Sequence, residues 1–340
     1  MMPVTRTNPA NGESENHKGW NLVGNPYPSP VDWLVESGWD KSDINDAKYI
    51  WNPSADNYTI FLGGTNPVGI NGGTQFIPSN QGFWVQATTN GSISINNACR
   101  KGIMNSTPDY YKNQEIDYPF ISLVCKGNSL SDETLVRFIG QASPDFDLNL
   151  DAIKLFSFSD KTPQISSMLV STALAINTLA EITDNLEIPL SFYCLTEGDF
   201  SLSLDPKSHT DEFRDIYLFD RILKQLTNLK HDKIYEFHHR TTNIKTRFLL
   251  IINPTREKLA ALETGDKFRV YAIGKRIFID KLDGEDKYCK LIVSNLMGQR
   301  IYSRDFISNS NTFKLNADNG IYVFSIITKS GIFSKKLYIN

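Results

Sequence analysis

Short runs of apolar and aromatic residues recur along most of the chain, and turn-forming Gly, Asn, Pro and Asp residues separate them. In residues 200–204, Phe and Leu alternate with Ser, which is the period of two expected of a strand with one buried face. The longest apolar run, residues 247–252, has the length of a strand and falls far short of the roughly 20 residues that cross a bilayer. The pattern predicts an all-β protein that does not span a membrane.

Two long stretches of the chain differ in composition and in the length of their strand-like runs. Residues 19–112 are rich in Gly, Asn, Pro and aromatic residues and hold all five tryptophans, whereas residues 113–256 carry longer strand-like runs. We interpret residues 171–179 as extended despite their Ala and Leu content, because strand-like sequence surrounds them. Residues 19–256 are therefore predicted as a β-sandwich region, and a division into halves 19–112 and 113–256 stays open.

Residues 267–340 have the most regular pattern. Short runs with strand character follow one another here, at 268–273, 276–281, 290–294, 300–306, 312–315, 320–328 and 332–339. Such a series of short strands with turn signals between them is typical of an immunoglobulin-like sandwich. The charged residues 257–266 before it are expected to form a short helical linker. The predicted fold class is all-β, a multi-domain β-sandwich with a C-terminal immunoglobulin-like sandwich.

The amino-acid composition excludes some classes of protein and of binding partner. The chain has 340 residues with 40% hydrophobic and 21% charged residues, which excludes global disorder, and its net charge of -3 argues against a nucleic-acid partner. Residues 1–18 are polar and lack the apolar core of a signal peptide, so they are expected to be a disordered or cloning-derived leader. Four widely spaced cysteines form neither a disulfide framework nor a zinc site and are predicted to be buried thiols.

The C-terminal run resembles the type A sorting domain of the type IX secretion system, which certain Gram-negative bacteria use. The matching segments are LIVSNLMGQRIY at 291–302, NGIYVFSI at 319–326 and GIFSKKLYI at 331–339. The resemblance implies a secreted or outer-surface protein whose partner is the secretion machinery. It also implies that a sorting signal is carried by Gly320, Tyr322, Gly331, Lys335 and Lys336. We expect residues 320–328 to be a central strand buried on both faces, and the two lysines to lie on an edge strand.

The front part is similar to segments that precede such sorting domains in large exported proteins of the same bacteria. The matching segments are GWNLVGNPYP at 19–28, DW at 32–33, YIWNP at 49–53, QGFWV at 81–85 and SDETLVRF at 131–138. This resemblance implies an exported surface protein and brings no catalytic residues with it.

No catalytic motif is found in the sequence, whether a nucleophile elbow, a metalloprotease helix or a phosphate-binding loop. His238 and His239 are adjacent on a predicted strand and so point to opposite faces, which disfavours a shared metal ion. The carboxylates of residues 132–133, Glu197 and Asp199 could form a glycosidase pair only if the fold brought two of them together. We expect no enzyme, with a hydrolase as the alternative.

An alternation of acidic residues matches the opening of a calcium loop, at Asp145, Asp147, Asn149 and Asp151. The later positions of an EF-hand do not match, because Leu150 stands where the loop needs glycine. The interpretation we favour is that the carboxylates are solvated and that no cofactor is bound, with a calcium site in a β-sandwich loop as the alternative.

The tryptophans are the other candidate for ligand binding, because flat aromatic rings can stack on sugars. Those inside strand-like runs are expected to pack in a core. Trp33 and Trp39 are expected to be exposed, since they lie beside a short helix predicted over residues 31–36, with Ser29 as its cap and Pro30 at its first position.

Together these features predict a non-enzymatic structural or adhesive module, secreted or held at the cell surface, with a C-terminal sorting domain. A carbohydrate-binding module of a polysaccharide-handling surface protein is the alternative, and a glycan or a surface protein is the expected ligand.

Overall fold

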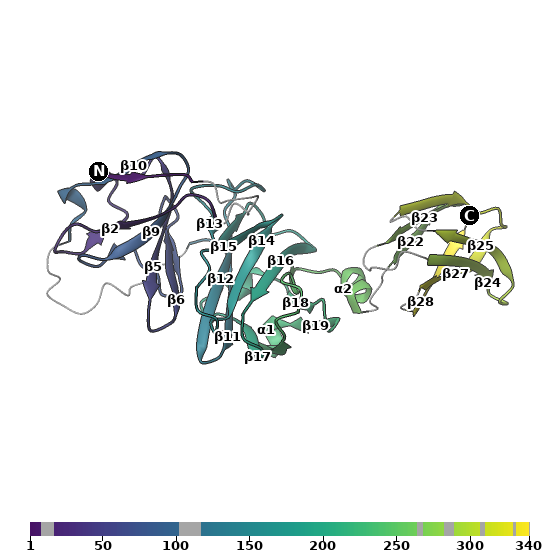
Figure 1. Cartoon of the computed structure of the whole chain (residues 1–340). Coiled ribbons are helices and arrows are strands. Elements are labelled where there is room, and N and C mark those ends of the chain that lie inside the picture. Colours follow the sequence, from purple (N-terminus) through teal and green to yellow (C-terminus); the bar gives the residue numbers. More distant parts are fainter. Residues whose placement is uncertain are drawn as a thin grey trace. The chain divides into compact units, whose positions relative to one another are not determined.

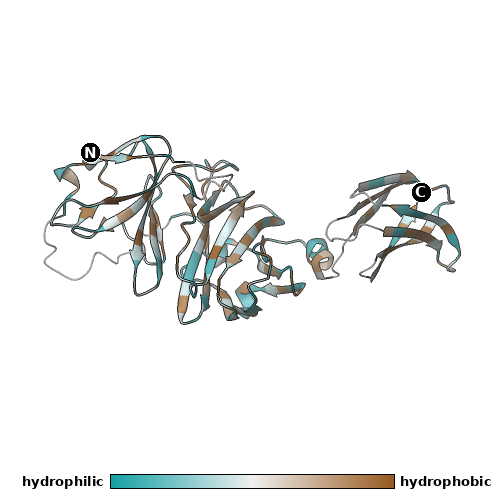
Figure 2. Cartoon of the chain, viewed as in Figure 1, coloured by the Kyte–Doolittle hydropathy of each residue, from teal (hydrophilic) through white to brown (hydrophobic). Residues whose placement is uncertain are grey.

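The structure is a computed structural model that describes residues 1–7, 17–101, 117–263, 268–281, 289–306, 310–328 and 331–339. The chain divides into two compact units, Met1–Thr255 and Arg256–Asn340 (Figure 1). Strands make up 53% of the structure and helices 7%, which confirms the predicted all-β, multi-domain class. Apolar and polar residues alternate along many of the strands (Figure 2).

The first part of the first unit contains three small antiparallel sheets. The strands, in chain order, are β1 (Met2–Val4), β2 (Trp20–Gly24), β3 (Val31–Asp32), β4 (Trp39–Asp40), β5 (Ile44–Asn52), β6 (Asn57–Leu62), β7 (Val68–Ile70), β8 (Phe76–Ile77), β9 (Gly82–Ala87) and β10 (Gly91–Ile95). They pair in the orders β2-β9-β5-β6-β7, β1-β10-β4 and β3-β8. The short 3-10 helices η2 (Glu36–Gly38) and η3 (Asn97–Cys99) lie between them.

The five-stranded sheet is covered on both faces. One face packs in a cluster around Trp33, Trp39 and Phe83, and the other packs in a second cluster around Tyr49 and Ile60. Because successive side chains of a strand point to opposite faces, β5 and β9 supply residues to both clusters. The sheet is thus the central layer of this part.

The second part of the first unit is one eleven-stranded sheet that folds over its own core. Its strands are β11 (Phe120–Gly127), β12 (Leu130–Phe138), β13 (Ala152–Ile153), β14 (Gln164–Leu169), β15 (Thr172–Leu179), β16 (Leu186–Tyr193), β17 (Gly198–Leu204), β18 (Ile216–Asp220), β19 (Gln225–Asn228), β20 (Ile234–His239) and β21 (Phe248–Ile252). The order is β19-β18-β21-β16-β14-β15-β12-β11-β17-β20, with β13 paired to β15. All ladders are antiparallel except that of β12 with β15.

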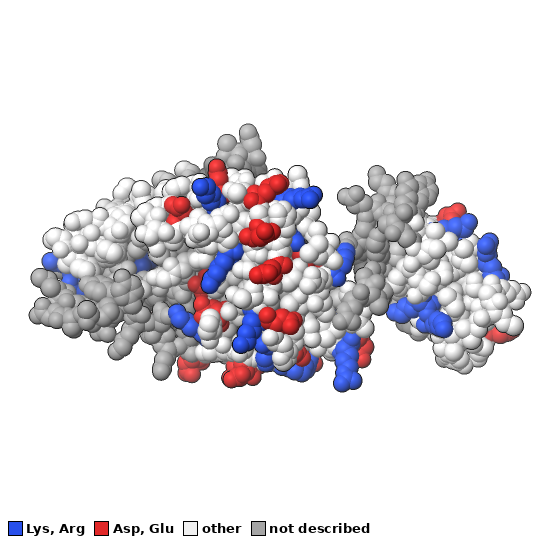
Figure 3. Space-filling model, turned by 90° about the horizontal axis from the view of Figure 1, so that it is seen from below, with Lys and Arg blue, Asp and Glu red and all other residues white. Residues whose placement is uncertain are grey.

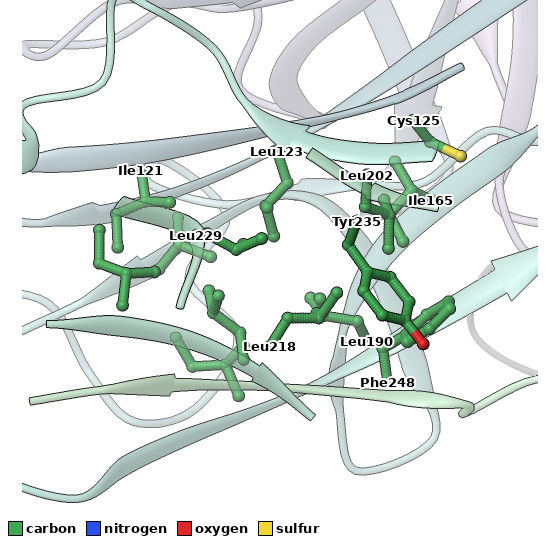
Figure 4. Close-up of a cluster of buried hydrophobic side chains, with 14 of the residues drawn as sticks. Ile121, Leu123, Cys125, Ile165, Leu190, Leu202, Leu218, Leu229, Tyr235 and Phe248 are labelled. Atoms are coloured by element: carbon green, nitrogen blue, oxygen red, sulfur yellow. The ribbon is translucent and has the colours of Figure 1, made fainter. Parts of the chain in front are cut away.

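The core of this sandwich lies between the two arms of the sheet. Side chains of β11 and β17, such as Leu123 and Leu202, meet side chains of β16, β18 and β21, such as Leu190, Leu218 and Phe248 (Figure 4). All of these residues are buried. The remaining short helices of this part are η5 (Thr210–Glu212) and α1 (Leu229–Asp232), which joins β19 to β20. The predicted extended conformation of residues 171–179 is confirmed by β15.

The two parts of the first unit share a core. The cluster around Tyr49 and Ile60 also contains Phe120, Leu135 and Ile176 from the eleven-stranded sheet. The open question of two halves is therefore answered by a single compact unit, and the boundary proposed at 112/113 lies outside the described residues.

Two local predictions for the first unit were wrong. Met2–Val4 is not disordered, because it pairs with β10 and buries Val4 in the first core, while residues 8–16 of the proposed leader lie outside the described residues. Residues 31–36 are not a helix either. Val31 and Asp32 pair with β8 instead. Burial of the Val31 side chain in the core stabilises this strand, whereas an isolated helical turn is unstable in water.

The second unit is a two-sheet sandwich, preceded by the helix α2 (Arg256–Glu263). Its strands are β22 (Phe268–Ile273), β23 (Arg276–Lys281), β24 (Cys289–Asn295), β25 (Arg300–Phe306), β26 (Ser310–Lys314), β27 (Gly320–Thr328) and β28 (Gly331–Ile339). They form the sheets β22-β23-β26 and β25-β24-β27-β28 around one core. This division of consecutive strands between two sheets is that of an immunoglobulin-like sandwich. The predicted helical character of the linker is confirmed by α2, and its residues 264–266 lie outside the described residues.

The strand β27 is central in its sheet, as predicted, but it is not buried on both faces. Tyr322, Phe324 and Ile326 point into the core, whereas Ile321 on the opposite face is exposed. The core of a two-layer sandwich lies on one side of each sheet only, so apolar residues on the outer face of β27 face solvent.

Candidate functional site

The two tryptophans expected to be exposed are buried. Trp33 is 0% exposed and Trp39 is 8% exposed. Their rings meet edge to face, with centroids 4.8 Å apart, and each indole N–H donates to a backbone carbonyl, at 3.0 Å to Asp46 O and 2.8 Å to Asp32 O. The prediction that they form a ligand surface was wrong, because Phe83 and the strands around it cover both rings.

The other three tryptophans, Trp20, Trp51 and Trp84, are half-buried and pack against the second cluster of the first unit. The expectation that they contribute to a core is confirmed, although each keeps part of its ring at the surface. Trp20 meets Tyr49 edge to face at 4.9 Å.

The acidic loop binds its own backbone. Asp151 is 2% exposed, and its two carboxylate oxygens accept the N–H groups of Asp147 and Thr178 at 2.8 and 2.7 Å. Asp147 in turn accepts the N–H of Asn149 at 2.8 Å, and the N–H of Asp145 donates to Ser143 Oγ at 3.0 Å. The arrangement fastens the loop beside β15. A bound calcium ion stays a hypothesis, and the predicted solvation of Asp151 was wrong.

Asp151 is expected to make stability depend on pH. Burial raises its pKa from 3.8 to about 6, against the opposing effect of its two N–H donors. Between about pH 4 and pH 6 the folded chain then holds a proton on Asp151 that the unfolded chain has lost. The contribution of Asp151 to the free energy of unfolding therefore falls as pH rises through that window, by up to about 3 kcal/mol. Asp151→Asn should be less stable than the parent protein, by a margin that narrows as pH rises from 4 to 6. Urea unfolding at several pH values measures this margin, and a margin that does not change with pH would contradict the assignment.

Asp132 lies at the centre of a buried polar network that joins the two parts of the first unit. It is 0% exposed and forms an ion pair of 2.5 Å with Lys154, which is also buried. The same carboxylate accepts Asn57 Nδ2 at 2.8 Å, Asn71 Nδ2 at 2.9 Å and the N–H of Ile165 at 2.8 Å. Four donors saturate one carboxylate, so Asp132 has a structural role and is not available as a general acid or base.

The neighbours of Asp132 in the SDETLVRF segment serve the same junction. Glu133 accepts Ser122 Oγ at 2.5 Å and the N–H of Asn71 at 2.8 Å, and burial raises the pKa of Glu133. Arg137 is fully buried and donates to Thr178 Oγ1 at 2.8 Å and to the carbonyls of Asn66 and Leu150. Residues 132–133 were among the carboxylates considered for a glycosidase pair, and in the structure they hold segments of the first unit together.

A second buried charge network lies in the sandwich and was missed in the sequence. Arg247 donates to Asp220 Oδ2 through Nε at 2.9 Å and Nη2 at 2.6 Å, and the Tyr235 hydroxyl donates to the same oxygen at 2.8 Å. Burial alone would raise the pKa of Asp220, but these hydrogen bonds lower it below its usual value. Nothing in the local sequence pairs residues so far apart, and the network has the saturated geometry of a structural element.

The histidines of β20 lie on opposite faces, as predicted. His239 is buried, with Nε2 3.0 Å from Cys194 O, whereas His238 is exposed, with Nδ1 2.8 Å from Asp199 Oδ1. Among the described residues, no three His, Cys, Asp or Glu side chains lie close enough to hold a metal ion. Of the carboxylates considered for a hydrolase, Asp199 pairs with His238 and Glu197 accepts the N–H of Thr241.

An open groove of about 910 Å³ lies over β11, β17, β20 and the start of β12. Its charged lining consists of Lys126, Asp199, Glu236 and His238. Basic and acidic side chains are interspersed over the described part of the face drawn in Figure 3, and no single sign dominates it. Two carboxylates, Asp199 and Glu236, line the groove, but Asp199 is already in contact with His238 Nδ1, which does not favour a glycosidase pair here.

The residues proposed as a sorting signal fall on the last two strands. Gly320 begins β27 and Gly331 begins β28, while the Tyr322 hydroxyl donates to Asp318 O at 2.8 Å. Lys335 and Lys336 lie on β28, which is the edge strand that was predicted. Lys335 is half-buried opposite Phe324, whereas Lys336 is exposed opposite Val323. A charge on the inner side of an edge strand discourages pairing with another chain.

The cysteines are all buried, and no disulfide joins the described residues, as the sequence predicted. Within the described part of the chain, no helix has both the length and the apolar character needed to span a bilayer.

Comparison with known proteins places the first unit in a family. The profile of the family described as "Domain of unknown function (DUF8693)" matches residues 1–252, which nearly coincide with the unit Met1–Thr255. No curated protein matches the chain.

Proposed function

The chain belongs to the family of unknown function DUF8693, and on this premise we propose that it is a non-enzymatic structural or adhesive module of a secreted or cell-surface protein. The observation that carries the proposal is the use of the candidate catalytic carboxylates in structural contacts. Asp132 and Glu133 hold segments of the first unit together, and Asp199 pairs with His238 at the surface. A single compact unit whose two parts share a core cluster suits a module that presents a surface.

We propose further that the second unit directs export. Three features support this: it is a compact unit separate from the first, it has the strand order of an immunoglobulin-like sandwich, and its segments resemble a type IX sorting domain. The Lys pair lies on edge strand β28, and Lys336 is accessible to a partner. The first unit then forms the cargo that the sorting domain takes to the surface.

The proposal is tested with a fluorescent reporter that carries a signal peptide at its start and residues 256–340 at its end. In a bacterium with a type IX secretion system, we expect this fusion to reach the surface or the medium. A matched fusion with residues 1–255 should stay in the periplasm. Cell fractionation and protease accessibility of the reporter measure the outcome.

Two variants separate the signal from the fold. Lys335→Ala/Lys336→Ala should keep the sandwich folded, because charges at the surface contribute little to stability, but should reduce export. If the fusion with residues 256–340 stays in the periplasm while it is folded, the second unit is an ordinary terminal sandwich and the proposed localisation fails.

A further inference from the structure

An exposed phenylalanine lies on the loop between β13 and β14. Phe158 is 72% exposed, although large apolar side chains are normally buried. Its ring stacks on Trp51 of β5, with centroids 4.1 Å apart and ring planes 22° apart. Tyr58 of β6 meets Trp51 edge to face at 5.1 Å. One face of Phe158 therefore rests on an indole, and most of the remaining ring surface faces solvent.

The loop that carries Phe158 is held in place by hydrogen bonds. Ser157 Oγ and Thr162 Oγ1 both donate to the carbonyl of Asp56, at 2.6 and 2.9 Å. The N–H of Ser157 donates to Gln164 Oε1 at 2.5 Å, and Gln164 Nε2 donates back to Ser157 O at 3.2 Å. These contacts fix the backbone on one side of Phe158 to both the β5–β6 turn and β14. The ring is thus presented in one position before any ligand binds, which lowers the entropy lost on binding.

The surroundings of the ring define the ligand that would fit it. Ser159, Asp160 and Lys161 follow Phe158 in the loop, and Asp160 and Lys161 are exposed. A ligand that matches this surface needs one flat apolar face and a polar rim. A pyranose has both, because its axial C–H groups form an apolar face and its hydroxyl groups surround it. An aliphatic peptide side chain has no flat apolar face ringed by hydroxyl groups.

We propose that Phe158, supported by Trp51, is a stacking platform for a pyranose ring of a glycan. This deepens the adhesive part of the proposed function by naming the class of ligand. It does not depend on export, because binding can be measured with the purified chain.

The test uses the full chain and hexasaccharides of β-1,4-glucose, β-1,3-glucose and β-1,4-mannose, preceded by a printed array of pyranose glycans. Binding is followed by calorimetry and by tryptophan fluorescence, to which Trp51 contributes. We expect saturable binding to at least one glycan, with an affinity that falls about tenfold or more in Phe158→Ala and changes less than about threefold in Phe158→Tyr. Val170→Ala is the matched control, since Val170 is 96% exposed and lies in the turn between β14 and β15, outside the ring cluster of Phe158, Trp51 and Tyr58.

Three results would overturn the proposal. The first is the absence of binding to every glycan at millimolar concentration by the folded chain. The second is glycan binding that Phe158→Ala leaves unchanged. The third is binding of a proline-rich peptide through Phe158 without binding of any sugar, which would make the surface a peptide site. Failure of export in the reporter assay leaves all three measurements unaffected, so the two proposals are tested separately.

Discussion

Asp132→Asn is expected to lower the free energy of unfolding of the first unit by about 3 kcal/mol or more. The substitution keeps the shape of the side chain but removes the charge that pairs with the buried ammonium of Lys154. It also replaces one acceptor oxygen by an N–H₂ group that faces the donors of Lys154 and Ile165. Urea unfolding monitored by tryptophan fluorescence measures the loss.

A double-mutant cycle with Lys154→Met isolates the ion pair from the other contacts of Asp132. We expect the double variant to be more stable than the sum of the two single changes predicts, because neither charge of the pair is then buried without the other. Asp184→Asn serves as the matched control, since Asp184 pairs with Arg214 at the surface. This substitution should lower the free energy of unfolding by less than about 1 kcal/mol. Additive single effects would show that the pair is not coupled.

The same variant bears on how the two parts of the first unit unfold. Asp132 joins β12 to Asn57 and Asn71 of the first part, and the cluster around Tyr49 extends into the eleven-stranded sheet. A network and a core that both cross the junction make separate unfolding unfavourable. We therefore attribute a single transition to Met1–Thr255, and the loss of Asp132 should shift that transition as a whole.

The strands were the part of the fold that the sequence predicted well. The bounds predicted for β22 and β23 agree with the structure to the residue, because short apolar runs end there at glycine or at charged turn residues. Where a run is bounded in this way, local pattern and tertiary structure agree. The helix predicted over residues 31–36 failed for the opposite reason, since its cap signals were local, whereas its partner strand β8 could not be seen locally.

The candidate site was harder to predict, because burial is set by residues far away in sequence. The exposure of Trp33 cannot be read without Phe83, which covers it from β9. The role of Asp132 depends on Asn57, 75 residues away, and on Lys154. Phe158 had no signal at all, since a phenylalanine in an ordinary loop becomes notable only when the fold places it on Trp51. The alternation of apolar and polar residues along a strand shows which face of the strand is buried, but it does not show which residues of other elements pack against that face.

Removing residues 331–340 is expected to unfold the second unit and leave the first unit intact. Strand β28 pairs with β27 over its whole length, and Ile339 is fully buried while Phe333 and Leu337 pack against the same core. Deleting one buried aliphatic side chain costs about 2–5 kcal/mol, and a small domain is stable by about 5–15 kcal/mol in total. The loss of three core side chains together with a full ladder of hydrogen bonds exceeds what such a sandwich can tolerate.

Calorimetry and limited proteolysis of the truncated chain measure this outcome. We expect the transition of the first unit to keep its temperature, while residues 256–330 become sensitive to protease, because the two units have separate cores. Lys335→Ala/Lys336→Ala is the matched control, since it changes β28 without removing Phe333, Leu337 or Ile339, and it should leave both units folded. If the truncated chain instead lost the structure of the first unit as well, the two units would be energetically coupled. The second unit could then not act as an independent export signal, and the separation of cargo from signal on which the proposed function depends would be lost.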